Sequence, residues 1–107
     1  MKYGLSTSNL KEIQRVFTNN DRVKKVILFG SRAMGTYKPG SDVDLVIQGD
    51  LITLNDIISL NIRLEELDFL IHFDLLSWSS ITDPNVLDHI KRVGIAIYDK
   101  SNFSLVD

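Results

Sequence analysis

The stretch LFGSRAMGTYKPGSDVDLVI, residues 28–47, connects two apolar runs and decides how the chain folds. The first run, VKKVILF at residues 23–29, is rich in β-branched and aromatic residues and stops at Gly30, which predicts a strand. The second run, DVDLVIQ at residues 42–48, is equally apolar after an acidic start and predicts another strand. A strand that only packs against a core has no need to open with two aspartates. The stretch therefore also points to a binding site.

The polar link between these runs has the composition of a turn followed by a loop. Residues 31–35 are predicted to form a short helical turn directly after the first strand. Residues 36–41 contain Pro39-Gly40 and are predicted to form a loop.

Helices are predicted on both sides of this stretch. One is expected to begin near Asn9, because Asn9 and Glu12 have the spacing of a capping box and apolar residues then recur at helical intervals. Another is expected to begin at Thr53 and Asp56 and to run to about Glu66, with one apolar face.

The rest of the chain continues this alternation. The remaining predicted elements are a strand at residues 69–76, a helix that starts at Asp83-Pro84 and ends before Gly94, a short strand at residues 95–98 and a loose tail from about residue 100. The alternation predicts an α/β (α+β) domain, a small sheet with helices mainly on one face. With no linker or repeat, we expect residues 1–107 to form a single domain.

Composition narrows the classes of function. The net charge is −2, so no overall basic field favours nucleic acid or an anionic membrane, and neither is an expected partner. The chain has no cysteine, which excludes disulfides, zinc–thiolate sites and a thiol nucleophile. The N-terminal residues lack an apolar leader segment, and no apolar run is long enough to span a bilayer. We therefore expect a cytoplasmic protein.

Acidic residues form the first candidate site. Successive side chains of a strand alternate between its faces, so Asp42 and Asp44 point the same way while Val43 and Leu45 point into the core. Asp74 would complete a group of three carboxylates if its strand lies beside theirs. Two such charges 4 Å apart repel by about 4 kcal/mol at an effective dielectric constant near 20. A divalent cation removes this cost, and carboxylate oxygens suit Mg²⁺ or Mn²⁺.

A phosphate site is predicted beside these acids. Gly30 has no side chain where the strand turns, which lets a ligand approach the backbone. The amides that follow, together with the Ser31 hydroxyl, can face an anion, and Arg32 and Lys38 add positive charge. A phosphate site next to metal-binding carboxylates is typical of phosphoryl or nucleotidyl transfer.

The spacing of these residues is shared with a known family. Gly30-Ser31, ten intervening residues and Asp42-Val43-Asp44 read GS-x10-DxD. This pattern closely resembles the signature of the DNA polymerase β-like nucleotidyltransferase superfamily. Within it the chain resembles the minimal nucleotidyltransferases, small proteins often encoded beside an all-helical HEPN-domain protein. The resemblance covers nearly the whole chain and includes a third acidic position on a later strand, which Asp74 matches.

The resemblance implies a fold, an activity and a set of roles. It implies a polymerase β palm-like sheet and transfer of a nucleoside monophosphate from a nucleoside triphosphate, with release of pyrophosphate. Gly30 and Ser31 would hold the β- and γ-phosphates, and Asp42 and Asp44 would bind one or two Mg²⁺ ions. Asp74 would bind the catalytic metal and act as, or assist, the general base. Members paired with HEPN toxins are similar to antitoxins that add AMP from ATP to a tyrosine of the partner.

Alternatives stay open at this point. Many relatives read GSRARG, whereas this chain has Met34 in place of the second arginine, which puts one phosphate contact in doubt. The chain would then be a non-catalytic antitoxin or adaptor that neutralises a helical partner by binding. Transfer to a small hydroxyl compound is a weaker option, because larger members carry a second domain for the acceptor. The acceptor site would be completed by a partner or by a second copy of the chain.

Other residues have two interpretations each. Arg32 is either a phosphate contact or part of a surface ion pair, and Lys38 is either a phosphate contact or an ordinary loop lysine. His72 would face the same side as Asp74, although a lone histidine on a strand is more often a packed or surface residue. The remaining candidates are His89, which is expected to be structural, and Trp78 with Tyr37, which would stack on a base or lie at the edge of the core.

Overall fold

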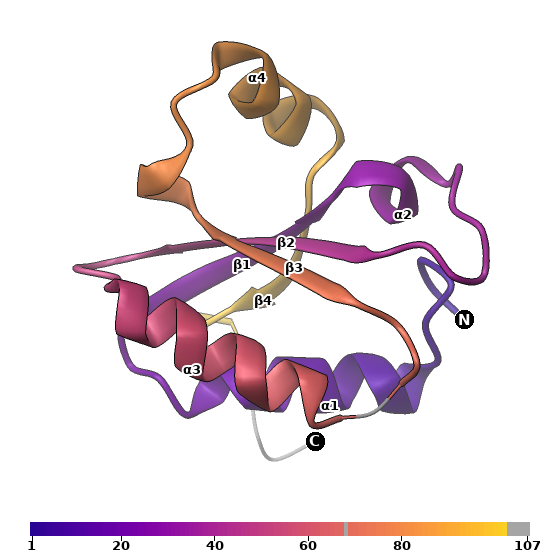
Figure 1. The fold of residues 1–107 in the computed structure, drawn as a ribbon, viewed down its shortest axis with the longest axis horizontal. Helices are drawn as coiled ribbons and strands as arrows, with labels where there is room; N and C mark the ends of the chain where they lie inside the picture. Colours follow the sequence, from indigo (N-terminus) through magenta and orange to yellow (C-terminus); the bar gives the residue numbers. More distant parts are fainter. Residues whose placement is uncertain (68, 103–107) are drawn as a thin grey trace.

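A four-stranded sheet with the order β3-β2-β1-β4 forms the centre of the computed structural model (Figure 1). β1 (Val23–Phe29) is antiparallel to both neighbours, β2 (Val43–Gly49) and β4 (Ile95–Asp99). β2 is parallel to β3 (Phe73–Ser77), which forms one edge. The mixed sheet, with helices between its strands, confirms the predicted α+β class.

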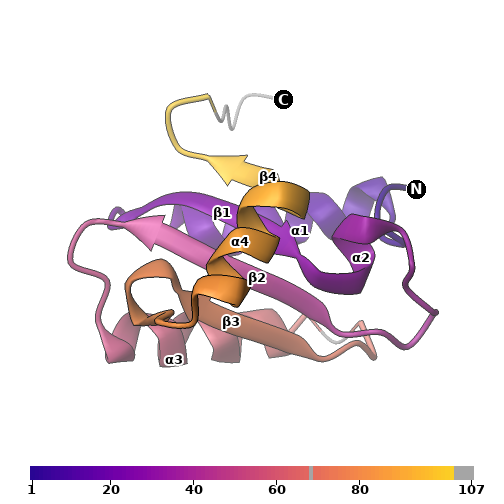
Figure 2. The same ribbon diagram turned by 90° about the horizontal axis from the view of Figure 1, so that it is seen from above.

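Helices lie on both sides of this sheet, but the two longest share one side. α1 (Thr7–Thr18) and α3 (Leu54–Glu65) lie next to each other on that face, as Figure 1 shows. α4 (Pro84–Val93) and the short α2 (Gly30–Met34) lie on the other side, where Figure 2 shows α4 crossing over β1. A 3-10 turn, η1 (Trp78–Ser80), follows β3 in the connection that leads to α4.

Strand alternation separates a core face from an open face. Val43, Leu45 and Ile47 of β2 are fully buried and belong to the core that α1 and α3 cover. The residues between them therefore point to the α4 side of the sheet, and the first of these is Asp44. The core is completed by apolar residues from every layer, among them Ile13, Phe17, Val26, Leu28, Leu64, Phe73, Leu75 and Ile97.

Two helix starts are confirmed by their caps. Thr53 is the N-cap of α3, and its side chain and that of Asp56 bond each other's backbone N–H groups in a capping box. Asp83 is the N-cap of α4, and Pro84 is the first residue of that helix. Both signals depend on a few neighbouring residues only, which explains why the sequence shows them clearly.

Two predicted boundaries were wrong. α1 begins at Thr7 rather than near Asn9, because the Ser6 hydroxyl accepts the Asn9 N–H at 3.0 Å and caps the helix three residues earlier. β3 begins at Phe73 rather than at residue 69, because its partner strand begins at Val43, directly opposite. Phe69 and Ile71 pack against the core from the connection, whereas Leu70 between them is exposed and has a positive φ of 59°.

The structure describes residues 1–67 and 69–102. Residues 103–107, most of the tail predicted to be loose, lie outside this range. No helix in the described ranges combines the length and the apolar character needed to cross a membrane.

α3 offers a matched test of the core assignment. Leu64 is fully buried, whereas Leu54 on the same helix is 72% exposed. We expect Leu64→Ala to lower the free energy of unfolding by about 2–5 kcal/mol, because it leaves a cavity under the sheet. Leu54→Ala should change it by less than about 0.5 kcal/mol. Urea denaturation of both variants measures the difference, and equal losses would contradict this packing.

Candidate active site

The central feature of the site is a pair of aspartates on neighbouring strands. Asp44 of β2 is directly opposite Asp74 of β3 in the parallel register. Neighbouring strands lie about 4.8 Å apart, and residues directly opposite each other point to the same face. The two carboxylates therefore lie side by side on the α4 side of the sheet. Phe29 of β1 pairs with Asp44 from its other side, so the end of β1 reaches the same point.

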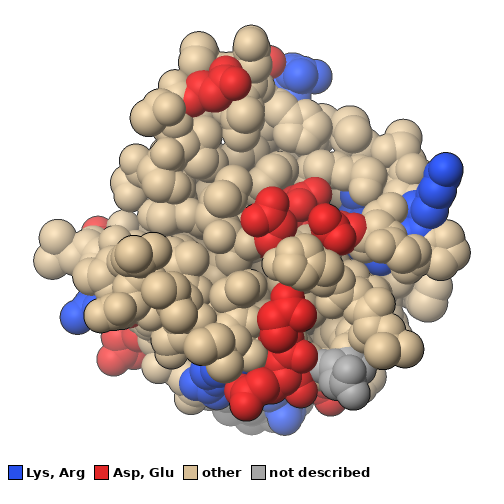
Figure 3. Space-filling model, in the orientation of Figure 1, with Lys and Arg blue, Asp and Glu red and all other residues tan. Residues whose placement is uncertain are grey.

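Asp42 completes the acidic group. It precedes β2 by one residue and is exposed, two positions before Asp44. The pKa of Asp44 is raised above its ordinary value of 3.8, first by burial and then by the negative charges of Asp74 and Asp42. His89 and His72 act in the opposite direction only when their rings are charged. Figure 3 shows acidic side chains gathered over the sheet next to α2.

The donor chemistry of this group fits a divalent cation. None of the ion pairs within the described residues involves Asp42, Asp44 or Asp74, so no ion pair in this part of the chain offsets their mutual repulsion. Carboxylate oxygens are the ligands that Mg²⁺ prefers. In the same described ranges, no three acidic or histidine side chains are already at metal-binding separation. Metal binding by these residues therefore stays a prediction.

Gly30 is required where β1 turns into α2. Its φ is +74°, and a Cβ at this position would lie 2.3 Å from Oδ2 of Asp44. A side chain here would displace the carboxylate, so the glycine and the aspartate form one close-packed unit. Ser31 follows in the first turn of α2, where backbone N–H groups have no partner within the helix. Gly30, with Ser31 next in the chain, thus lies directly beside Asp44.

Arg32 points away from this group. It is only 2% exposed, and its three guanidinium nitrogens donate to the carbonyl oxygens of Tyr3, Pro39 and Ser41. Its Cζ also lies 5.3 Å from the centre of the Tyr37 ring. Arg32 therefore holds the loop between α2 and β2 against the N-terminal segment. This placement argues against both predicted interpretations, the direct phosphate contact and the surface ion pair.

Lys38 and Met34 are exposed on the segment between the glycine turn and β2. The Lys38 backbone N–H donates to Ser41 Oγ at 2.8 Å and shapes the loop, while its side chain is in solvent. Met34 is 49% exposed at the end of α2. A phosphate contact from Lys38 remains a prediction.

The two histidines have different surroundings. His72 is exposed, with Nδ1 at 3.3 Å from Oε1 of Glu65. Nε2 of His89 on α4 accepts the Gly30 N–H at 3.2 Å, which brings this helix to the turn. Sequence reasoning gave His89 a structural role. No local pattern could have placed it here, because the contact joins residues 59 positions apart.

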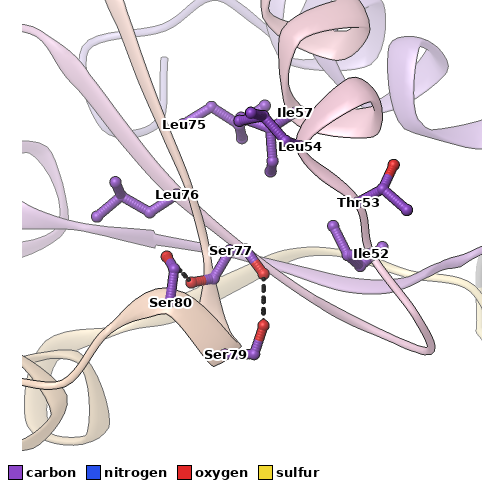
Figure 4. Close-up of a pocket in the computed structure, with 9 residues that line it drawn as sticks. All are labelled: Ile52, Thr53, Leu54, Ile57, Leu75, Leu76, Ser77, Ser79 and Ser80. Atoms are coloured by element: carbon purple, nitrogen blue, oxygen red, sulfur yellow. Dashed lines mark hydrogen bonds between the residues drawn. The ribbon is translucent and has the colours of Figure 1, made fainter.

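The two aromatic candidates, Tyr37 and Trp78, have different surroundings. Tyr37 lies against Arg32, whereas Trp78 lines a separate hollow of about 310 Å³ between the sheet and α4, together with Ile27, Gln48 and Ile90. A second hollow, of about 290 Å³, lies between the start of α3 and the end of β3 (Figure 4). No carboxylate lines either hollow. Asp42 and Asp74 are both exposed, so the acidic group is accessible from solvent.

Comparison with known proteins agrees with this geometry. The family described as "Polymerase beta, Nucleotidyltransferase" matches residues 11–103, which include the glycine turn and all three aspartates. The chain belongs to this nucleotidyltransferase family. The predicted family resemblance is confirmed.

Individual relatives match either a short part of the chain or the whole of it at low sequence identity. A stretch of 30 residues is 57% identical to "Putative protein adenylyltransferase MJ0604" of Methanocaldococcus jannaschii and covers 28% of this chain. The match spans 30% of the length of that relative.

Solved structures share the fold. A toxin–antitoxin crystal structure with AMP-PNP is 21% identical, with a TM-score of 0.67 over 90% of this chain and 75% of that chain. The Shewanella oneidensis complex of an MNT antitoxin with a tri-AMPylated HEPN toxin is 18% identical, with a TM-score of 0.66 over 91% and 75%. A structure described as a "putative nucleotidyltransferase" from Sulfolobus solfataricus is 18% identical in sequence. Its TM-score is 0.53 over 98% of this chain and 96% of that chain.

The close contact at Gly30 can be tested against a second glycine. Gly30 and Gly35 both have positive φ, but a Cβ at Gly35 would have no atom within 4 Å. Gly35→Ala should therefore lose only the roughly 1–2 kcal/mol of the left-handed backbone. Gly30→Ala should lose more and should also abolish binding of Mg·ATP, because the methyl group displaces the Asp44 carboxylate. Urea denaturation and calorimetric titration measure both effects, and matching results for the two variants would remove Gly30 from the site.

The acidic group also predicts how stability depends on pH. Because the folded-state pKa of Asp44 is raised, the folded chain holds a proton that the unfolded chain has released, from about pH 3.8 up to the raised value. The free energy of unfolding therefore falls as pH rises through this window. Asp44→Asn should be more stable than the parent at pH 7 without Mg²⁺, and this gain should vanish below the window.

The exposed Asp50→Asn variant, far from the acidic group, is the control and should show no such gain. Thermal unfolding from pH 3 to pH 7 provides the measurement. Adding Mg²⁺ should stabilise the parent but not Asp44→Asn. An Asp44→Asn variant that is less stable than the parent at pH 7 would contradict mutual repulsion at this site.

Proposed function

We propose that this nucleotidyltransferase is Mg²⁺-dependent and transfers AMP from ATP to a hydroxyl group of a partner protein, as the antitoxin of a HEPN-domain toxin. The observation that carries the proposal is the pairing of Asp44 with Asp74 beside the Gly30-Ser31 turn. Carboxylates and a phosphate-binding turn at one point are what nucleotidyl transfer requires.

Each residue of the site has a proposed role. Asp42, Asp44 and Asp74 would hold one or two Mg²⁺ ions, with Mn²⁺ as a substitute, and Gly30 and Ser31 would bind the β- and γ-phosphates. Bound Mg²⁺ would neutralise the developing charge on the phosphates and orient them. Asp74 is exposed, so an acceptor can approach it from solvent, and its carboxylate would take the proton of the attacking hydroxyl.

The reaction follows from these roles. The acceptor oxygen forms a bond to the α-phosphorus, and the bond between the α-phosphorus and the bridging oxygen to the β-phosphate breaks. Pyrophosphate leaves while the Gly30-Ser31 turn still holds its phosphates. The site lies open on the surface, so a large acceptor such as a protein side chain can reach it.

The nature of the partner is supported by the relatives. Solved structures of the same fold are toxin–antitoxin complexes, one with AMP-PNP and one with an AMPylated HEPN toxin. The stretch of high identity belongs to a protein described as an adenylyltransferase. An all-helical HEPN protein with a tyrosine acceptor is therefore the proposed partner.

A second candidate is a non-catalytic antitoxin that acts by binding alone. Two observations favour it: Arg32 is turned into the loop, and Met34 stands at the end of α2. The site would then lack the phosphate contacts of two arginines and keep its acidic residues without turnover.

One experiment separates the two candidates. The chain is incubated with Mg²⁺, labelled ATP and the HEPN-domain protein encoded beside it. We expect label on the partner, and the label should fall to background with Asp42→Ala or Asp44→Ala, because the metal ligands are lost. Asp50→Asn is the exposed acidic control and should transfer normally. Neutralisation of the toxin by the Asp42→Ala/Asp44→Ala double variant, with no label transferred by the parent, would reject catalysis and support binding alone.

A further inference from the structure

His89 is the one histidine among the described residues that contacts the glycine turn, and the roles assigned above leave it unused. Its Nε2 lies 3.2 Å from the Gly30 nitrogen and accepts that N–H. An imidazole nitrogen can accept only when it is unprotonated, so the proton of the neutral ring is on Nδ1. The Gly30 N–H is one of the groups that the start of a helix leaves without a partner, and His89 satisfies it.

The position of the His89 imidazole is set by an aromatic contact and by the packing of α4 on the sheet. Phe29 lies edge-on to the imidazole, with ring centroids 6.2 Å apart and planes at 80°. The next residue of the helix, Ile90, is 2% exposed and anchors α4 on the sheet. At the end of α4, a Cβ on Gly94 would lie 2.7 Å from Cγ2 of Ile27, so helix and strand are in close contact. His89 therefore reaches Gly30 from a helix whose position is set independently of the turn.

Gly30, which His89 holds, is also in close contact with the acidic group. The Cα of Gly30 packs so closely on Asp44 that a side chain on Gly30 would not fit between them. A glycine at positive φ has wide conformational freedom and needs an external contact to keep one orientation. The hydrogen bond from the Gly30 N–H to His89 is such a contact.

We propose that His89 is a positioning residue of the nucleotide site, which fixes the Gly30-Ser31 turn against Asp44 by accepting the Gly30 N–H. This rests on the proposed function only for the ligand, a nucleoside triphosphate. The role needs the acceptor atom of the side chain rather than its charge. A glutamine at this position, which carries an acceptor oxygen at similar reach, can replace it.

The contact itself is measured by NMR without any ligand. Phe29-Gly30 is the only Phe-Gly pair in the sequence, so combined ¹³C-phenylalanine and ¹⁵N-glycine labelling selects the Gly30 amide alone. In His89→Ala its proton resonance should move upfield, because the hydrogen bond is lost, and in His89→Gln it should return toward the parent value. Arg92→Gln, an exposed change one turn along α4, should leave it in place.

The effect on the site is measured by titration with Mg·ATP. His89→Ala should weaken the affinity roughly 2- to 12-fold, the range expected for one lost hydrogen bond, and His89→Gln should restore most of it. An unmoved Gly30 resonance or an unchanged affinity in a folded His89→Ala overturns the proposal. If His89→Ala does not fold, His89→Gln decides it: parent-like resonance and affinity support the role, and loss of either rejects it.

These readouts separate this proposal from the function. A parent chain that does not bind Mg·ATP refutes the proposed function and the nucleotide role of His89 together. A parent that binds Mg·ATP while His89→Ala keeps its affinity refutes the role of His89 alone.

Discussion

The parallel pairing of Asp44 with Asp74 is the constraint on which the rest of the site depends. Two carboxylates on adjacent strands repel each other, and the pKa of Asp44 is raised first by burial and then by that repulsion. The register persists because the opposite face of the same two strands is deeply buried. A shift by one residue would turn Val43, Leu45 and Phe73 toward solvent. The hydrophobic core thus holds in place an arrangement of charges that is unfavourable until a cation binds.

The parts of the molecule that depend on local chemistry could be predicted from the sequence. The caps of α3 and α4 involve residues within one helical turn, and the strands β1 and β2 follow from β-branched runs that end at glycine and begin after a proline–glycine turn. The common face of Asp42 and Asp44 follows from the period of a strand. The link to Asp74 needed the family resemblance, because nothing in the sequence alone says which strands are neighbours.

Apart from the start of α1, which Ser6 caps locally, the parts that sequence reasoning missed depend on contacts outside the local pattern. Arg32 has the sequence context of a phosphate ligand, yet it bonds to carbonyl oxygens on either side of its own position and closes a loop. His89 has no distinguishing neighbours, and only the path of α4 across the sheet brings it to the turn. The start of β3 is set by the start of the strand beside it. In each case the deciding partner is distant in the chain.

α3 presents Leu54, Ile58 and Ile62 to solvent at a spacing of four residues, on the side of the sheet away from the aspartates. The two sides of the sheet therefore differ in character, because one carries the acidic group and the other an exposed apolar row. A protein bound to this apolar row would leave Asp44 and Asp74 uncovered.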